Sequence, residues 1–284
     1  MEKKLNSFIL STFTIIILSV ILLPLFLLLG RINTTKSSDL TLLPNEKTVS
    51  RMPFQDNRET VILSESPDMG QDYIDRLVFL GESTTYGLWR YGVLSNGLST
   101  TQVWTGASCS NEKISCAGTL ALSPAIASTK IYDPENGNAV TIAEAVSTKK
   151  PEFLIITLGL NNGASYYSED QFKQCYRILL NSIFNASSET IVILQSLFPV
   201  AESCKVAVYT PERLELCNSW ICDLAVEYGI KYLDTFSILS NDRGYLKPEY
   251  DNGGDGIHLN AEGLHAVVQY IRTHGYSEEE GALS

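Results

Sequence analysis

Basic residues and histidines are scarce in this sequence. Its 284 residues include 21 Lys and Arg against 32 Asp and Glu, which gives a net charge of -11. Such an excess of negative charge repels a phosphate backbone, so nucleic acid is excluded as an expected partner. Only three histidines are present, and no C-x-x-C occurs among the six cysteines. The ligand spacing of a zinc site is therefore missing, and we predict no metal or other cofactor.

The cysteines indicate an oxidising compartment, in which disulfides persist. Cys109 and Cys116 bound a short polar loop that a disulfide would close, and a bond between Cys204 and Cys217 would close another. Spacing alone does not fix the pairing. Two further cysteines lie in expected helices, where a buried thiol is the simpler interpretation. These are Cys175 and Cys222.

A long apolar run lies near the start of the chain. Residues 8–30 contain no charged side chain, and about 20 apolar residues at ~1.5 Å rise each are enough to span a bilayer. Lys3 and Lys4 precede the run, and a positive flank tends to stay in the cytoplasm. We therefore expect residues 1–7 to be cytoplasmic, residues 8–30 to be a single-pass transmembrane anchor in the cell membrane, and the rest to be extracytoplasmic. A cleaved signal peptide is the alternative, but its apolar core is usually shorter and ends at a small-x-small cleavage site.

The remainder of the chain divides into a linker and a domain. Residues 31–57 are polar and rich in turn-forming residues, which is typical of a linker. Over residues 58–284, short apolar runs alternate with longer amphipathic segments, without a repeat. This length fits one globular domain.

Four short apolar runs are the clearest strands of that domain. Each is bounded by polar or turn residues. Continuous rather than alternating hydrophobicity is typical of strands that are buried on both faces of a parallel sheet. The runs are residues 76–80, 153–158, 190–195 and 230–233.

Helical patterns lie between these runs. Ser168 begins one, because it is followed three positions later by Gln171 and then by apolar residues at helical spacing. Pro211 suits the first turn of a second helix that continues to Tyr228, and a final apolar helix extends to Ile271. Repetition of strand and helix predicts a three-layer α/β/α fold with a mostly parallel sheet.

Polar residues follow the strands at the edge where ligands gather in such sheets. Ser83 lies in Gly-Glu-Ser-Thr-Thr-Tyr-Gly after the first run, and Asn161 lies in Gly-Leu-Asn-Asn-Gly after the second. Near the end, Asp255 precedes His258 by three residues, so that it can bond one ring nitrogen while the other accepts a serine proton. Taken singly, these motifs also suit a helix cap, an Asn-Gly turn and a surface-loop histidine.

In this order along the chain, the three motifs resemble the SGNH or GDSL-like hydrolase family. The resemblance extends from about residue 76 to residue 271 and implies a flavodoxin-like fold. It implies Ser83 as the nucleophile, His258 as base and then acid, and Asp255 as the partner of His258. Asn161 matches the family's oxyanion asparagine, the Ser83 backbone N–H is a second donor, and Gly106 is the candidate for a third.

Two positions depart from the family pattern. Glu82 and Asn162 stand where the family usually has aspartate, although neither is the nucleophile or the base. The implied reaction is two-step acyl transfer without a metal. Ser83 attacks an ester carbonyl after losing its proton to His258, and water later releases the acid.

An extracytoplasmic location favours a carbohydrate as the natural alcohol. We predict a serine esterase that removes a small acyl group such as acetyl from a cell-wall or capsule polysaccharide. Aromatic side chains near the motifs are candidates for stacking on sugars, and equally suit the core: Tyr86, Trp89, Trp104, Tyr166 and Tyr167. A lipid-ester or thioester hydrolase is the nearest alternative. The others are a polysaccharide O-acyltransferase and a non-catalytic carbohydrate-binding module on the same fold.

Overall fold

A computed structural model of the chain describes residues 57–94, 101–110, 113–118 and 120–277. All of them belong to the unit Phe54–Ser284. The expected cytoplasmic end, the anchor over 8–30 and nearly all of the linker lie outside these ranges. Within them, no helix has the length and apolar character needed to cross a membrane.

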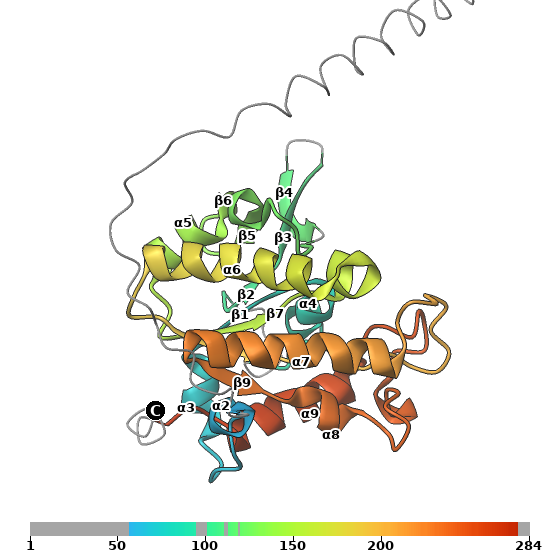
Figure 1. Cartoon of the computed structure of the whole chain (residues 1–284). Coiled ribbons are helices and arrows are strands. Elements are labelled where there is room, and N and C mark those ends of the chain that lie inside the picture. Colours follow the sequence, from blue (N-terminus) through green and yellow to red (C-terminus); the bar gives the residue numbers. More distant parts are fainter. Residues whose placement is uncertain (1–56, 95–100, 111–112, 119, 278–284) are drawn as a thin grey trace, which may run out of the picture. The chain divides into compact units, whose positions relative to one another are not determined.

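Five parallel strands form the central sheet, in the order β2-β1-β7-β8-β9 (Figure 1). The strands are β1 (Leu77–Gly81), β2 (Val103–Trp104), β7 (Phe153–Thr157), β8 (Ile191–Gln195) and β9 (Lys231–Leu233). The four apolar runs of the sequence are thus four of these strands, which confirms the mostly parallel sheet. The fifth strand, β2, has only two residues, too few for a pattern to be visible.

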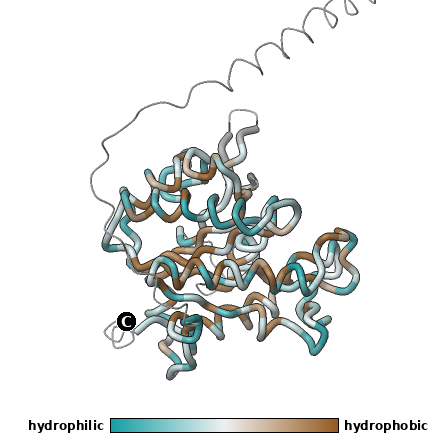
Figure 2. The backbone as a smooth tube through the Cα atoms, in the orientation of Figure 1, coloured by the Kyte–Doolittle hydropathy of each residue, from teal (hydrophilic) through white to brown (hydrophobic). Residues whose placement is uncertain are grey.

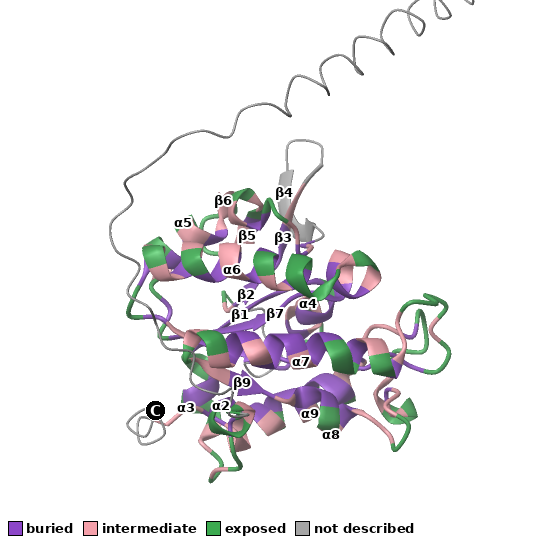
Figure 3. Cartoon of the chain, in the orientation of Figure 1, coloured by how far each residue is buried: buried purple, intermediate pink, exposed green. Residues whose placement is uncertain are grey.

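Both faces of the sheet are buried. Along β1, Val78 and Leu80 join the core on one face, while Leu77 and Phe79 join the core on the other. Figure 3 shows β1 and β7 as buried throughout. Burial of each such side chain stabilises the folded state by about 1.5–3 kcal/mol. Burial on both faces therefore explains why these runs are continuously apolar.

Helices cover the two faces and complete the three layers. One core contains residues from α5 (Ile142–Lys149), α6 (Glu169–Ala186) and α7 (Pro211–Tyr228). The other contains residues from α3 (Gly70–Asp75), α4 (Ser83–Arg90), α8 (Thr235–Leu239) and α9 (Ala261–Thr273). The remaining helical segments are α2 (Arg58–Val61), η1 (Ile126–Ser128), η2 (Leu160–Ala164) and η3 (Pro248–Tyr250). The three-layer α/β/α prediction is confirmed.

The long helices begin where their sequences predict. Ser168 and Gln171 form the capping box of α6, and Pro211 occupies the first turn of α7. Both helices alternate hydrophobic and hydrophilic residues in Figure 2, as expected when one face packs on the sheet. The final helix α9 ends at Thr273, two residues beyond the predicted end.

A second, antiparallel sheet was not expected from the sequence. Its strand order is β4-β3-β5-β6. The strands are β3 (Gly106–Ser110), β4 (Lys113–Gly118), β5 (Lys130–Asp133) and β6 (Asn138–Thr141). The segment from Cys109 to Cys116, interpreted above as a polar loop, lies mainly in the β3–β4 pair, so that interpretation is wrong.

The proposed disulfide between Cys204 and Cys217 is also wrong. Both are free thiols. Cys217 is fully buried on the core face of α7, whereas Cys204 lies in the loop after β8 and packs against Gly256. Cys175 and Cys222 are buried on α6 and α7, as predicted. The side chains of Cys109 and Cys116 lie outside the described part of the structure, so their pairing stays a prediction.

Candidate active site

The topology of the central sheet selects one place for a site. Counted within that sheet alone, the strand order is 2-1-3-4-5, and ligands bind where the chain leaves two neighbouring strands in opposite directions. Here those strands are β1 and β7, which pair from Leu77–Phe153 to Gly81–Thr157. The loops after them carry Ser83 and Asn161, so the fold brings two predicted site residues to adjacent strand ends.

Ser83 is presented by a tight passage from strand to helix. It is the first residue of α4 and is exposed, while Gly81 and Glu82 before it are buried. A Cβ on Gly81 would lie 2.0 Å from Thr85 Oγ1 and 2.7 Å from the Thr157 carbonyl oxygen. Only glycine therefore allows α4 to begin this close to the sheet.

Asp255 and His258 reach Ser83 from the loop before α9. His258 Nε2 lies 2.9 Å from Ser83 Oγ, and His258 Nδ1 lies 2.6 Å from Asp255 Oδ2. The structure thus joins the three residues in one hydrogen-bonded chain across 175 residues of sequence. This is the arrangement in which an imidazole can move a serine proton while a carboxylate orients the ring.

The Asp255–His258 turn is held by its own backbone. Asp255 Oδ1 accepts the N–H of Ile257 at 2.8 Å and that of His258 at 3.1 Å. Gly256 has φ +72, and a Cβ there would lie 2.8 Å from the Cys204 nitrogen. The Ala201 N–H also donates to the Gly256 carbonyl, so the loop after β8 supports the turn that carries the imidazole.

The Asp255 carboxyl is suited to remain ionised. Partial burial acts to raise its pKa, but the N–H groups of Ile257 and His258 and the imidazole outweigh that effect, and the pKa lies below its usual value. The group is a carboxylate at neutral pH, as the orienting partner of a histidine must be.

Asn161 follows the carboxyl end of β7, the strand that pairs with β1. Its side-chain Nδ2 donates to the Leu120 carbonyl at 3.1 Å. An amide nitrogen carries two hydrogens, so a second hydrogen remains for a ligand. Gly106 is buried and follows β2 by two residues, at the same edge of the sheet. The oxyanion roles of Asn161, Gly106 and the Ser83 N–H stay predictions.

Glu82 was noted in the sequence only as a departure from the family pattern, and its role in the site was not inferred there. Its side chain is 2% exposed. Its carboxylate accepts the N–H of Gly159 at 2.9 Å and that of Asn161 at 3.1 and 3.0 Å. Burial raises the pKa of this carboxyl to about 8, against the opposing effect of the N–H groups of residues 159–161. An acidic residue within an otherwise buried passage was the available signal.

One of the five candidate aromatics is strongly exposed. Tyr166 is 79% exposed, in the helical turn directly after η2. Trp104 belongs to the core, and the rings of Tyr86 and Trp89 contact each other at a tilt of 36°, with centroids 5.1 Å apart. Tyr167 is partly buried and packs on the core. A role in stacking on a substrate therefore suits Tyr166 best.

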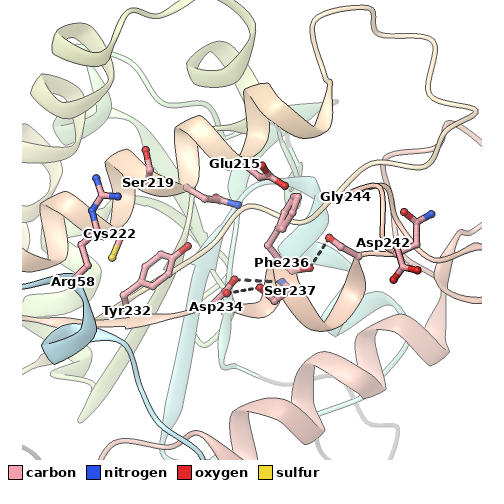
Figure 4. Close-up of a pocket in the computed structure, with 13 residues that line it drawn as sticks. Arg58, Glu215, Ser219, Cys222, Tyr232, Asp234, Phe236, Ser237, Asp242 and Gly244 are labelled. Atoms are coloured by element: carbon pink, nitrogen blue, oxygen red, sulfur yellow. Dashed lines mark hydrogen bonds between the residues drawn. The ribbon is translucent and has the colours of Figure 1, made fainter. Parts of the chain in front are cut away.

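A separate pocket lies beyond the last strand of the sheet (Figure 4). It has a volume of about 580 Å³ and is lined by Arg58 of α2, by residues of α7, by Tyr232 on β9, and by α8 with the loops on either side of it. There Asp234 caps α8 by accepting the N–H and the hydroxyl of Ser237. Ser83, Asp255 and His258 do not line this pocket, so it is distinct from the serine–histidine–aspartate chain.

The comparisons with known proteins identify the family of the domain. The model of the GDSL-like lipase/acylhydrolase family matches residues 79–266. This range contains Ser83, Asp255 and His258. A search of the curated proteins found no sequence match.

Several solved structures are distantly similar in fold. A GDSL-like lipase from Bacteroides thetaiotaomicron is 18% identical over 81% of this chain and 96% of its own, with a TM-score of 0.46. A family 3 carbohydrate esterase from Clostridium thermocellum is 16% identical over 73% and 97%, with a TM-score of 0.44. A carbohydrate esterase of family 3 from Talaromyces cellulolyticus is 19% identical over 69% and 93%, with a TM-score of 0.42.

Proposed function

This chain belongs to the GDSL-like lipase/acylhydrolase family of ester-hydrolysing enzymes, and we propose that it hydrolyses a small acyl ester through Ser83, His258 and Asp255. The observation that carries the proposal is the hydrogen-bonded chain from Ser83 Oγ through both ring nitrogens of His258 to Asp255. Helix capping does not account for Ser83, because the N-cap of α4 is Glu82 and no side-chain cap hydrogen bond forms there.

The proposed reaction is acyl transfer in two steps. His258 Nε2 accepts the Ser83 proton as Oγ attacks the ester carbonyl, and Asp255 stabilises the resulting imidazolium. The imidazolium then donates its proton to the leaving alcohol, which leaves an acyl-serine. Water enters, gives a proton to His258 and attacks the acyl carbon. The proton returns to Ser83 Oγ when the acid leaves. Asn161 Nδ2 and the Ser83 N–H are the proposed donors to the oxyanion, with Gly106 as the third.

We further propose an acetylated polysaccharide as the substrate class. The support is the exposed ring of Tyr166, which follows η2 at the edge of the sheet that carries Ser83. An exposed aromatic face suits a sugar ring, which presents C–H groups to it. The extracytoplasmic location rests on the apolar run over 8–30 with Lys3 and Lys4 before it. Protection of the domain from protease added on the external side of intact cells would contradict that location.

A lipid ester is the second candidate, because the loop after β8 exposes two apolar side chains. Val206 and Val208 are 38% and 44% exposed. Tyr209 beside them donates to the Leu160 carbonyl and accepts from the Ser165 hydroxyl, so this loop borders the segment that carries Asn161. An acyl chain longer than acetyl would find apolar contacts there.

The test compares hydrolysis of aryl esters from acetyl to octanoyl by the full-length chain with that of Ser83→Ala and His258→Ala. Loss of activity in both variants supports the proposed mechanism. His265→Ala is the matched control, because His265 is exposed on α9, and it should keep full activity. A preference for acetyl favours the polysaccharide, whereas a preference for octanoyl favours the lipid ester.

Labelling by a serine-reactive fluorophosphonate provides an independent test. Wild-type protein that labels at Ser83 but hydrolyses no ester should be supplied with an acylated donor and a sugar acceptor, which tests acyl transfer. Wild-type protein that neither labels nor hydrolyses would contradict the proposal and leave a non-catalytic binding module.

A further inference from the structure

Glu82 occupies an unusual position for a carboxylate. It directly precedes the serine of the proposed site, it is almost fully buried, and it accepts hydrogen bonds from backbone N–H groups of the loop that follows the neighbouring strand β7. Burying a carboxylate is costly unless hydrogen bonds compensate. A residue kept at such a cost beside the nucleophile calls for a role that an apolar residue would not fill.

The N–H groups that Glu82 accepts belong to the segment that carries the Asn161 amide. The Asn161 N–H lies within hydrogen-bond distance of both carboxylate oxygens, and the Gly159 N–H bonds one of them. This segment is not regular helix: Gly159 has φ +120, and Asn162 has φ +66. Backbone in such sparsely populated conformations persists only when the surroundings hold it.

Two contacts together fix the Asn161 side chain. The backbone of Asn161 is held by Glu82, and its Nδ2 is held by the Leu120 carbonyl. Because Ser83 follows Glu82 in the chain, the same residue joins the end of β1, where the nucleophile lies, to the end of β7, where the amide lies. The separation between the attacking oxygen and the amide donor therefore depends on Glu82.

We propose that Glu82 is a positioning residue that holds the Asn161 amide at the oxyanion of the reaction, relative to Ser83. This inference rests on the proposed function, since it requires an oxyanion to form. Glu82 touches neither substrate nor reacting atoms in this role. Its effect is exerted on the transition state through Asn161, so its loss should lower kcat and leave KM nearly unchanged.

The test is a double-mutant cycle in the full-length chain with an aryl acetate as substrate. Asn161→Ala removes the donor and should lower kcat by about 10²–10³. Glu82→Gln places an NH₂ group against the Asn161 N–H, so that two donors face each other, and should lower kcat by about 10–100-fold. Introduced into Asn161→Ala, Glu82→Gln should lower kcat by no more than about twofold further, because the amide it positions is already absent.

Additive effects in the cycle would overturn the inference, since Glu82 would then act independently of Asn161. A large rise in KM with kcat unchanged would overturn it as well. Glu82→Asp keeps the carboxyl group with both of its oxygens and should recover part of the kcat lost in Glu82→Gln. Glu82→Asp also replaces the glutamine variant in the cycle if that variant fails to fold. A loss of kcat from Glu82→Asp that is equally large in wild type and in Asn161→Ala would contradict the positioning role.

The two proposals fail in different ways. Active wild-type protein with an additive cycle contradicts the role of Glu82 and leaves the proposed function standing. Wild-type protein that neither hydrolyses esters nor reacts with the fluorophosphonate contradicts both.

Discussion

Replacing Asp255 by asparagine tests the orienting role of this carboxylate with little disturbance to the fold. Asp255 uses Oδ1 to accept the N–H groups of Ile257 and His258, and Oδ2 to bond His258 Nδ1 at 2.6 Å. Asparagine keeps the first oxygen and therefore keeps the turn. At the second position it presents an NH₂ group, which donates to Nδ1 and forces the ring proton onto Nε2. In that tautomer the imidazole cannot accept the proton of Ser83.

The expected loss is large. The same exchange in serine proteases lowers kcat about 10⁴-fold, which corresponds to about 5.5 kcal/mol at 1.36 kcal/mol per tenfold. The side chains of His258 and Asp255 are 33% and 46% exposed, so water replaces part of the lost interaction with the imidazolium. We therefore expect kcat on an aryl acetate to fall by about 10³, with KM little changed.

Asp251→Asn is the matched control. Asp251 lies in the same loop and accepts the Gly253 N–H at 3.1 Å, a bond that asparagine can also make. Its kcat should stay within about twofold of wild type. If Asp255→Asn retained more than about a tenth of the wild-type kcat while unfolding at the same temperature, Asp255 would not be the residue that orients His258.

Three further predictions follow from burial and packing. Since burial raises the pKa of Glu82 from 4.5 to about 8, the stability that its proton provides is present below pH 4.5 and is lost as pH rises to 8. Between pH 4.5 and 8, the free energy of unfolding in urea should fall less for Glu82→Gln than for wild type, by on the order of 5 kcal/mol. The same pH dependence in both proteins would contradict this. Gly159→Ala should lower the free energy of unfolding by about 2–4 kcal/mol, since φ is +120 and a Cβ would lie 2.6 Å from Phe172 Cζ. Gly229→Ala, with φ +63 and open space, should cost about 1 kcal/mol in the same thermal or urea unfolding assay. Tyr166→Ala should raise KM about fivefold for an acetylated oligosaccharide, from loss of about 1 kcal/mol of ring contact, and an unchanged KM would exclude stacking.

The central sheet was predictable because strands that are buried on both faces appear in the sequence as continuous apolar runs. The run predicted over 153–158 became β7 at Phe153–Thr157, and the run over 230–233 became β9 at Lys231–Leu233. The positions of Ser83, Asp255 and His258 were predictable for a related reason. Ser83 follows a strand at the edge where ligands gather, and the order of the motifs along the chain, which resembles the family, indicated Asp255 and His258 as its partners.

The antiparallel sheet was not predictable from the same reasoning. Strands β3 and β4 consist largely of small and polar residues, Gly-Ala-Ser-Cys-Ser and Lys-Ile-Ser-Cys-Ala-Gly, which have neither an apolar run nor strong β propensity. Cysteine spacing suggested a closed loop there instead.

The role of Glu82 was hidden for a different reason. Its partners are backbone N–H groups 77 and 79 residues away, and a backbone group has no signature in the sequence. The failed Cys204–Cys217 pairing shows the same limit, because spacing does not reveal that Cys217 faces the core of α7.

The contacts that residues 58–63 make with β9 and α7 determine how the domain would respond to a mechanical load. Leu63 donates its N–H to the Tyr232 carbonyl, Ile62 forms a parallel bridge with Tyr232, and Arg58 pairs with Asp223 at 2.6 Å. These contacts tie the segment after Asn57 to β9 and α7. Tension applied to the chain before Asn57 would be borne first by the outermost strand of the sheet. Strand β1 lies three strands away, at a spacing of about 4.8 Å each, so a tether pulled on that side would distort the edge of the domain before it displaced the serine.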